Sequence, residues 1–540
     1  MKKNNFLQGA FIATLGIVIS KILGILYVIP FYAIIGEKGG ALYGYAYNIY
    51  TIFMGLSSSG IPFAISKLIS EYNTLGYQKA KIRAFKMGKK LSILLGVVCF
   101  LLLFIFAPSI SHLIIGDITG GNTKEEIIFV IRVISTAILV VPIMSIYRGY
   151  LQGHKVITPT SISQVLEQIV RIVIILSGSF LALNVFDLSL KTAVGFAVFG
   201  ATAGAIASYF YLYRKTIKNK KVLSSTIKDK KEPFISDKTI FRKIIVYAIP
   251  FIMIDFFKSI YNSVDVVTLV KTLVGLNYTI SDAESIMSVI STWGLKLNMI
   301  VLAVSTGIMV SLIPNLTASF VSKNMDDVRQ KINQTLQSLL YITLPMTVGL
   351  SLLSKPVWMI FYGESEYGSV VLAYFIFVAL IQAIFTAVVN IVQILKEYKT
   401  VVISLIVGFL TKVLLNVPLI YGFHKMGLPA YYGAITTTIL GLSVSTVVCL
   451  AKLNKKYQVG FESTLKQGMN IVGSVITMVI VILLMRFILP LYMGSRLMNI
   501  PLVAVYTIVG ALVYFLLTYK LGVVNYIFGD KLLKRLRKVK

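Results

Sequence analysis

The sequence predicts an all-α integral membrane protein with about fourteen transmembrane helices. Of its 540 residues, 57% are hydrophobic and only 14% are charged, whereas about a quarter of the residues in soluble domains are charged. Apolar runs long enough to cross a hydrocarbon core of about 30 Å follow one another with short polar loops between them. The runs are continuous, which is typical of helices and not of the alternating strands of a membrane β-barrel. These features exclude a soluble enzyme.

The spans can be assigned in order along the chain. The first run follows Met1-Lys2-Lys3 like a signal peptide, but it continues to Ile35, contains Lys21 and lacks a small-residue cleavage site. We therefore predict that it is the first spanning helix. The predicted spans are residues 9–35, 41–69, 91–115, 126–147, 159–183, 192–213, 244–273, 289–317, 334–353, 370–395, 401–421, 430–451, 469–490 and 502–520.

Basic residues are concentrated in alternate loops, which predicts the orientation of the chain. With the N-terminus inside, the inside loops hold the basic residues between Lys79 and Lys90, the segment 214–243 and the tail 520–540. Outside loops carry acidic residues such as Asp117 and Glu364. The positive-inside rule then predicts that both termini are cytoplasmic. The net charge of +31 follows from this topology, and no nucleic-acid partner is expected.

Two similar halves are predicted, joined by the longest inside loop. Residues near the fifth span recur near the eleventh with a constant spacing of 241 (393 − 152 = 241). The matched residues are Gln152, Lys155, Ser163 and Arg171 with Gln393, Lys396, Ser404 and Lys412. We predict an N-terminal six-helix half at 1–213, a basic cytoplasmic linker at 214–243, a parallel C-terminal half at 244–452, and two extra helices with a basic tail at 453–540. Transporters built from such repeats bind substrate between the halves and alternate access by rocking.

Five basic residues lie deep within the predicted spans, where one Lys or Arg costs about 2.5–3.5 kcal/mol. They are Lys21, Arg171, Lys258, Lys296 and Lys412. Glu167 lies one turn before Arg171, in the favourable order for an i, i+4 ion pair. We predict that Glu167 and Arg171 form a structural or gating pair.

The remaining lysines predict a central cationic cavity. Asp255 lies three residues before Lys258, but Lys21, Lys296 and Lys412 have no acidic residue within one helical turn. Unpaired cations at membrane depth indicate a water-filled cavity for an anionic ligand. The alternative is that each lysine pairs with a carboxylate on another helix. Lys67, near the end of the second span, either joins this set or extends to the membrane interface.

Signals for other chemistry are missing from the sequence. The three histidines are scattered without metal-ligand spacing, and there is no Walker-type phosphate loop. Cys99 and Cys449 fall inside apolar runs, which argues against a disulfide framework. No metal or cofactor is expected. The energy source is then the membrane potential, a coupling cation such as Na+ or H+, or consumption of the product.

One stretch resembles a family signature. It comprises Arg148-Gly149-Tyr150-Leu151-Gln152-Gly153, Pro159, Ser163-Gln164-Val165-Leu166-Glu167-Gln168 and Arg171. This stretch is similar to the stage V sporulation protein B-like branch of the multidrug/oligosaccharidyl-lipid/polysaccharide exporter superfamily, which includes the lipid II flippases of Gram-positive bacteria. Ser20-Lys21-Ile22-Leu23-Gly24 also resembles the first helix of this group. The resemblance extends over essentially the whole chain.

The resemblance implies export of an undecaprenyl-pyrophosphate-linked glycan, with lipid II preferred, across the bacterial plasma membrane. Lys21 and Lys296 match by position basic residues that line the pyrophosphate cavity in the Gram-negative flippases. Lys67 is a loose match to a third such residue, and Tyr27 stands where those proteins have a second arginine in helix one. Membrane lipids and cell-wall synthesis proteins are the further partners expected.

Other functions remain as alternatives. A flippase for another polyprenyl-linked oligosaccharide, of the capsule or teichuronic type, fits the same residues. A drug or cation exporter would carry unpaired acidic residues in spans one, two, three and six, which contain none. A glycosyl transferase or polymerase would need a carboxylate or metal site on a large external loop, and the outside loops are short. A scaffold acting through the loop 214–243 is the fourth alternative.

Overall fold

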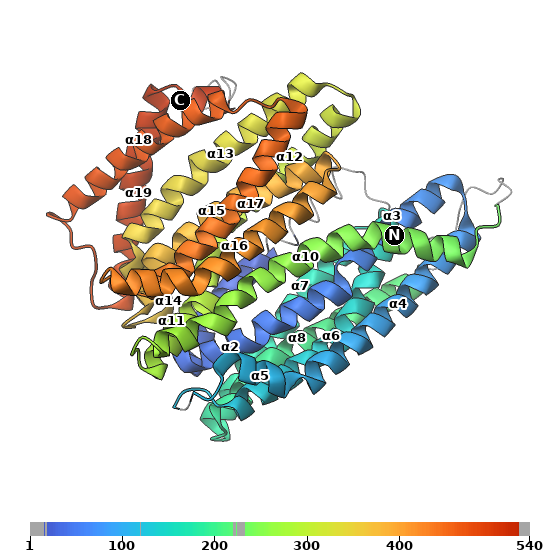
Figure 1. The fold of residues 1–540 in the computed structure, drawn as a ribbon, viewed down its shortest axis with the longest axis horizontal. Helices are drawn as coiled ribbons and strands as arrows, with labels where there is room; N and C mark the ends of the chain where they lie inside the picture. Colours follow the sequence, from blue (N-terminus) through green and yellow to red (C-terminus); the bar gives the residue numbers. More distant parts are fainter. Residues whose placement is uncertain (1–15, 17–18, 119, 220–222, 224–232, 529–540) are drawn as a thin grey trace. The chain divides into compact units, whose positions relative to one another are not determined.

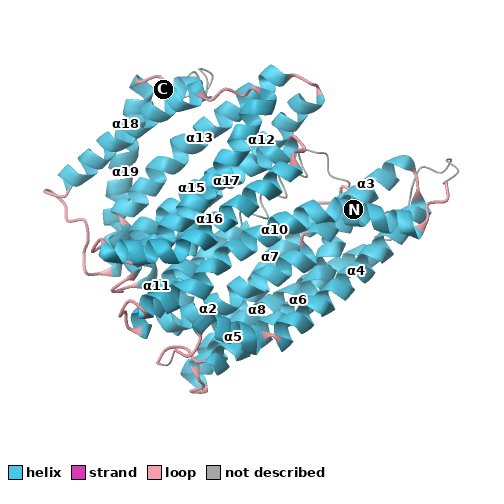
Figure 2. Ribbon diagram, in the orientation of Figure 1, coloured by secondary structure: helices cyan, strands magenta, loops and turns pink. Residues whose placement is uncertain are grey.

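The computed structural model describes residues 16, 19–118, 120–219, 223 and 233–528. Within these ranges the chain is helical and forms no strand, as Figure 2 shows. Twelve stretches of the described residues are long and apolar enough to cross a membrane. The prediction of an all-α, multi-pass membrane protein is therefore confirmed.

The number of spans and their orientation stay predictions. Residues Val28–Leu75 count as one of the twelve stretches, although the helix is interrupted at Gly36, whose φ is 63°. A positive φ of this size is easily adopted by glycine alone, so this position separates the first two predicted spans. The helix Asp237–Val274, which corresponds to the seventh predicted span, is not among the twelve.

The internal contacts of the chain divide it into two compact units, residues 1–293 and 294–540. In Figure 1 the first runs from blue to green and the second from yellow to red. The first unit contains α2 (Val28–Ser58), α3 (Gly60–Leu75), α4 (Gln78–Ile105), α5 (Ala107–Ile115), α6 (Lys124–Gly153), α7 (Thr158–Phe180) with the π-helical η1 (Leu181–Val185), α8 (Leu190–Lys218), α10 (Asp237–Val274), α11 (Ile280–Ser288) and the π-helical η2 (Val289–Trp293). The second contains α12 (Gly294–Val321), α13 (Met325–Leu352), α14 (Ser354–Tyr362), α15 (Gly368–Ile394), α16 (Tyr398–Lys425), α17 (Tyr431–Tyr457), α18 (Glu462–Met485), α19 (Arg496–Lys520) and α20 (Val523–Phe528).

The boundary between the compact units differs from that between the predicted halves. Helix α10, assigned by the sequence to the C-terminal half, packs against α2 and α3 of the first unit. The contact is close, because a methyl group on Gly60 would lie 2.3 Å from the carbonyl oxygen of Ala248. The predicted division into two six-helix halves follows a repeat in the sequence and not these contacts. That division stays a prediction.

Local geometry supports that repeat. Lys155 and Lys396, which are 241 residues apart in the sequence, both have a positive φ, 61° and 63°. Each amide donates to the carbonyl three residues earlier, at 2.8 Å in Lys155 and 2.9 Å in Lys396. The helices that follow, α7 and α16, each pack along the next long helix, α8 and α17. The two stretches therefore share the same turn and the same pairing of helices.

Two glycines of the signature bring α6 close to α3. A methyl group on Gly149 would lie 2.3 Å from the carbonyl oxygen of Pro62, and one on Gly153 would lie 2.6 Å from that of Ser66. Backbone atoms cannot move aside as the tip of a flexible side chain can. The close packing of these two helices therefore requires glycine at both positions.

We expect Gly149→Ala to lower the free energy of unfolding by about 1–3 kcal/mol, the usual cost of an added carbon in a tightly packed contact. Thermal unfolding of the purified protein in detergent measures this change. Gly473→Ala on α18 is the matched control, because no atom lies within 4 Å of the added methyl group. Alanine favours a helix over glycine, so the control is expected to unfold at the same temperature or slightly higher. Equal losses in both variants would contradict the assigned role of Gly149.

Candidate functional site

A polar cavity lies between α2, α6 and α10 of the first unit. Its volume is about 290 Å³, and its wall includes Asp255 and Lys258 together with hydroxyl groups such as those of Ser59 and Ser145. Asp255 and Lys258 lie three residues apart on α10, and both line the cavity together with Ser59. Lys258, one of the predicted site residues, thus lines a cavity that also holds a carboxylate. Sequence reasoning had already noted Asp255 as its neighbour.

A charged cluster joins α6, α7 and α8 in the same unit. Glu167 contacts Arg171 at 2.7 Å, as the i, i+4 spacing predicts, and it contacts Arg148 at 2.8 Å through its other oxygen. Arg148 also donates to the hydroxyl oxygens of Ser163 at 2.9 Å and Ser208 at 3.0 Å. One carboxylate therefore binds two guanidinium groups, and Arg148 connects three helices. The structural or gating role of the Glu167–Arg171 pair stays a prediction.

Arg148 was not among the predicted site residues. The fourth predicted span ended at residue 147, so Arg148 was assigned to the loop, whereas α6 continues to Gly153. The available signal was its place in the signature, which also contains its partners Ser163 and Glu167. Its partners lie 15, 19 and 60 residues away in the sequence, a distance that periodicity cannot bridge.

The other two predicted lysines of the first unit have different environments. Lys21 is half-buried in the helical segment 19–26. This segment packs on α7, because a methyl group on Gly24 would lie 3.5 Å from Nε2 of Gln168. Lys67 is exposed, and its ammonium lies 3.7 Å from the ring centroid of Tyr247. The structure therefore places Lys21 beside the helix that carries Glu167 and Arg171, and Lys67 beside an aromatic ring of α10.

Two predicted lysines belong to the second unit. Lys296 is half-buried on α12. Lys412 is fully buried on α16, and its Nζ donates to the Thr438 hydroxyl of α17 at 2.9 Å. One turn further along α16, Asn416 accepts a 2.5 Å hydrogen bond from Thr437. These contacts favour a role for Lys412 in joining α16 to α17, and its place in a ligand cavity stays a prediction.

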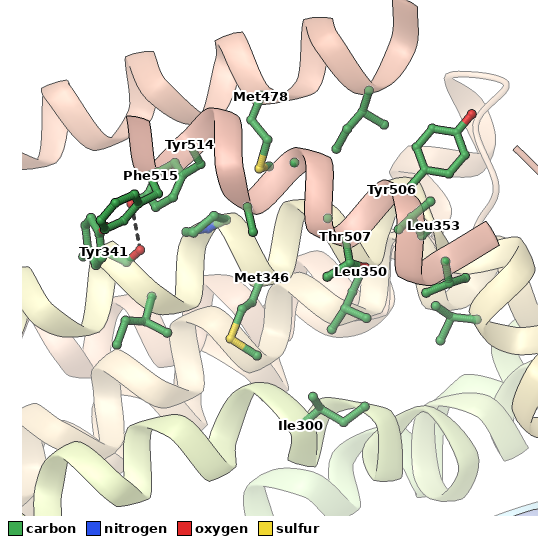
Figure 3. Close-up of a pocket in the computed structure, with 18 residues that line it drawn as sticks. Ile300, Tyr341, Met346, Leu350, Leu353, Met478, Tyr506, Thr507, Tyr514 and Phe515 are labelled. Atoms are coloured by element: carbon green, nitrogen blue, oxygen red, sulfur yellow. Dashed lines mark hydrogen bonds between the residues drawn. The ribbon is translucent and has the colours of Figure 1, made fainter. Parts of the chain in front are cut away.

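An apolar pocket lies beside the two extra helices of the second unit. It has a volume of about 490 Å³ and is lined mainly by α13 and α19, with Met478 and Ile482 from α18. Figure 3 shows aromatic and aliphatic side chains around it, including Tyr341, Tyr506 and Tyr514. The Tyr514 hydroxyl donates to the carbonyl oxygen of Tyr341 at 2.7 Å, and the Tyr506 hydroxyl donates to that of Leu489 at 2.6 Å. The polar ends of these rings are thus occupied, which leaves an apolar wall suited to hydrocarbon.

Residues 6–305 match the family described as "Polysaccharide biosynthesis protein". The chain belongs to this family. The lipid II flippase MurJ of Bacillus subtilis (strain 168) is 34% identical over 538 residues, which is 98% of each chain. Stage V sporulation protein B of the same bacterium is 30% identical over 240 residues, which is 43% of this chain and 44% of that protein.

Solved structures agree on the fold of this family member. A lipid II flippase MurJ in an inward closed conformation aligns with a TM-score of 0.64 at 16% identity, covering 95% of this chain and 99% of that one. An inward-facing multidrug resistance MATE transporter of the MOP superfamily aligns with a TM-score of 0.62 at 14% identity, covering 83% and 98%. The family membership predicted from the signature at residues 148–171 is confirmed. The chain is a multi-pass protein with the fold of MOP transporters.

Proposed function

We propose that this protein is a flippase that moves a polyprenyl-pyrophosphate-linked glycan, with lipid II preferred, from the inner to the outer leaflet of the bacterial plasma membrane. Alternating access moves the head group, and no bond is made or broken. The observation that carries this proposal is the 34% identity to a lipid II flippase over 98% of both chains. The lysines within the helices of this chain support it, because an anionic head group needs cations to replace its lost hydration.

The proposed ligands of the diphosphate are Lys21 and Lys258 in the first unit and Lys296 in the second. Each presents a compact ammonium charge that can follow the phosphates as they move, unlike the rigid fork of an arginine. The apolar pocket of about 490 Å³ supports a lipid-linked substrate, because it offers a protein surface to part of a polyprenyl chain. Asp255 balances the charge of Lys258 before the substrate binds.

The proposed energy source is the membrane potential or a coupling cation, Na+ or H+. One charge that crosses 100 mV gains or loses about 2.3 kcal/mol, so an anionic head group feels a substantial force. Cell-wall synthesis proteins that consume the exported precursor are the proposed partners on the outer side.

The experiment that tests the function is a depletion and complementation assay. We expect this chain, expressed in a bacterium whose only lipid II flippase can be switched off, to restore growth and the appearance of lipid II in the outer leaflet. Absence of rescue, with the protein present in the membrane, would contradict lipid II as the substrate. Rescue of a capsule or teichuronic acid exporter mutant instead would identify another polyprenyl-linked glycan, which the family description "Polysaccharide biosynthesis protein" also accommodates.

A further inference from the structure

The cluster on α6, α7 and α8 carries more positive than negative charge. Arg148 and Arg171 each contact Glu167, so two guanidinium groups share one carboxylate. Arg148 donates three hydrogen bonds, from Nε to Ser163 and from Nη2 to Glu167 and Ser208. The cluster therefore carries one excess positive charge, shared by Arg148 and by Arg171 in the middle of α7. A cation left over at membrane depth is unfavourable unless an anion joins it for part of the transport cycle.

Two hydrogen-bond donors beside this excess charge have no partner. Within the described part of the chain, neither Nε of Arg171 nor the hydroxyl of Tyr50 makes a hydrogen bond, and both atoms are buried. The Tyr50 side chain is 1% exposed. The guanidinium Nε–H can only donate, and the phenol can donate as well. An incoming oxyanion would satisfy both groups and balance the charge at once.

The two donors lie on helices that pack against each other, α2 and α7. Tyr43, Tyr47 and Tyr50 occupy positions i, i+4 and i+7 of α2, which is one face of a helix. Along this face the ring centroids of Tyr43 and Tyr47 lie 5.3 Å apart, and those of Tyr47 and Tyr50 lie 5.6 Å apart. Helix α2, which carries this tyrosine face, thus packs against the helix that carries Arg171.

The cluster adjoins the polar cavity that holds Lys258. Thr51, which directly follows Tyr50 on α2, lines that cavity. Ser145, three residues before Arg148 on α6, lines it as well. The Arg171 side chain is 18% exposed, although its Nε atom is buried. The cavity and the cluster thus adjoin along α6.

We propose that Arg171 and Tyr50 form an oxyanion subsite that receives a phosphate oxygen of the lipid-linked diphosphate. The subsite rests on the proposed function and adds a binding role to a residue expected to act only in a structural or gating pair. Arginine binds phosphate oxygens through charged, directional hydrogen bonds.

The test measures binding of undecaprenyl pyrophosphate and of undecaprenol to the purified full chain in detergent, by native mass spectrometry. Undecaprenol has the same tail without phosphates. We expect Tyr50→Phe to weaken binding of undecaprenyl pyrophosphate about fivefold and Arg171→Gln about tenfold or more, following the strengths of neutral and charged hydrogen bonds. Binding of undecaprenol is expected to stay unchanged. Tyr45→Phe is the matched control, because Tyr45 is another buried tyrosine of α2 whose hydroxyl has no partner among the described residues.

Three outcomes are decisive. Selective loss in Tyr50→Phe and Arg171→Gln, with Tyr45→Phe unchanged, supports the subsite. If both variants bind undecaprenyl pyrophosphate as tightly as the wild type, the subsite is wrong while the proposed function stands. If the wild type does not prefer undecaprenyl pyrophosphate to undecaprenol, the proposed function fails and the subsite with it. Should Arg171→Gln not fold, Tyr50→Phe decides, because it removes no existing hydrogen bond.

Discussion

A variant that carries both Lys21→Ala and Lys296→Ala is expected to support no growth when the resident lipid II flippase of the host is depleted. Each ammonium group is proposed to bind the diphosphate, and a hydrogen bond to a charged group contributes about 1.5–3 kcal/mol. Loss of one lysine then weakens binding at least about tenfold. Loss of both lysines weakens binding further. The binding energy then no longer offsets the hydration that the anionic head group loses when it leaves water. Colony formation during depletion, with the single variants beside the double, measures this result.

Two controls separate the loss of charge from a loss of folded protein. Lys90→Ala removes an exposed lysine of α4 that lies outside the proposed ligand set, and it is expected to grow like the wild type. Lys21→Arg with Lys296→Arg keeps both charges and is expected to retain partial export, because arginine binds phosphate but holds it more rigidly. Full growth of the double alanine variant, at wild-type protein levels, would exclude both lysines from the substrate site.

The fold class could be predicted because it depends on properties that every segment shows by itself. A helix in a membrane satisfies its own backbone, so length and apolarity of a run suffice to identify it. The interruption at Gly36 was harder to locate, because Gly39 and Gly40 follow closely and only the folded backbone shows which glycine has the positive φ. Likewise, the sequence of α10 does not reveal that this helix packs against α2 and α3.

The candidate site could be predicted only where its contacts are local. Glu167 and Arg171 are one turn apart on one helix, and their spacing identified the pair. Arg148 binds the same carboxylate from another helix, and Lys412 binds Thr438, which is 26 residues away. Contacts of this kind depend on which helices become neighbours and how each is rotated. A single sequence does not contain that information in its periodicity.

Replacing Glu167 is expected to have the largest effect on stability. Glu167→Gln leaves Arg148 and Arg171 buried on neighbouring helices without their carboxylate, and their side chains are only 15% and 18% exposed. Removing one partner of a buried ion pair costs about 3–5 kcal/mol, and here two cations lose the same partner. We expect a much lower unfolding temperature in detergent and little protein in the membrane. Glu125→Gln, an exposed carboxylate in the first turn of α6, is the control and is expected to change little.

A second substitution tests whether charge is the cause. The wild-type cluster has two cations and one anion, Glu167→Gln has two cations alone, and Glu167→Gln with Arg171→Gln has one cation alone. The double variant thus returns to an excess of one positive charge, held by Arg148 with its hydrogen bonds to Ser163 and Ser208. We expect it to unfold at a clearly higher temperature than Glu167→Gln, although it lacks the proposed oxyanion subsite. If the second change lowers stability further, the loss in Glu167→Gln comes from packing and not from uncompensated charge.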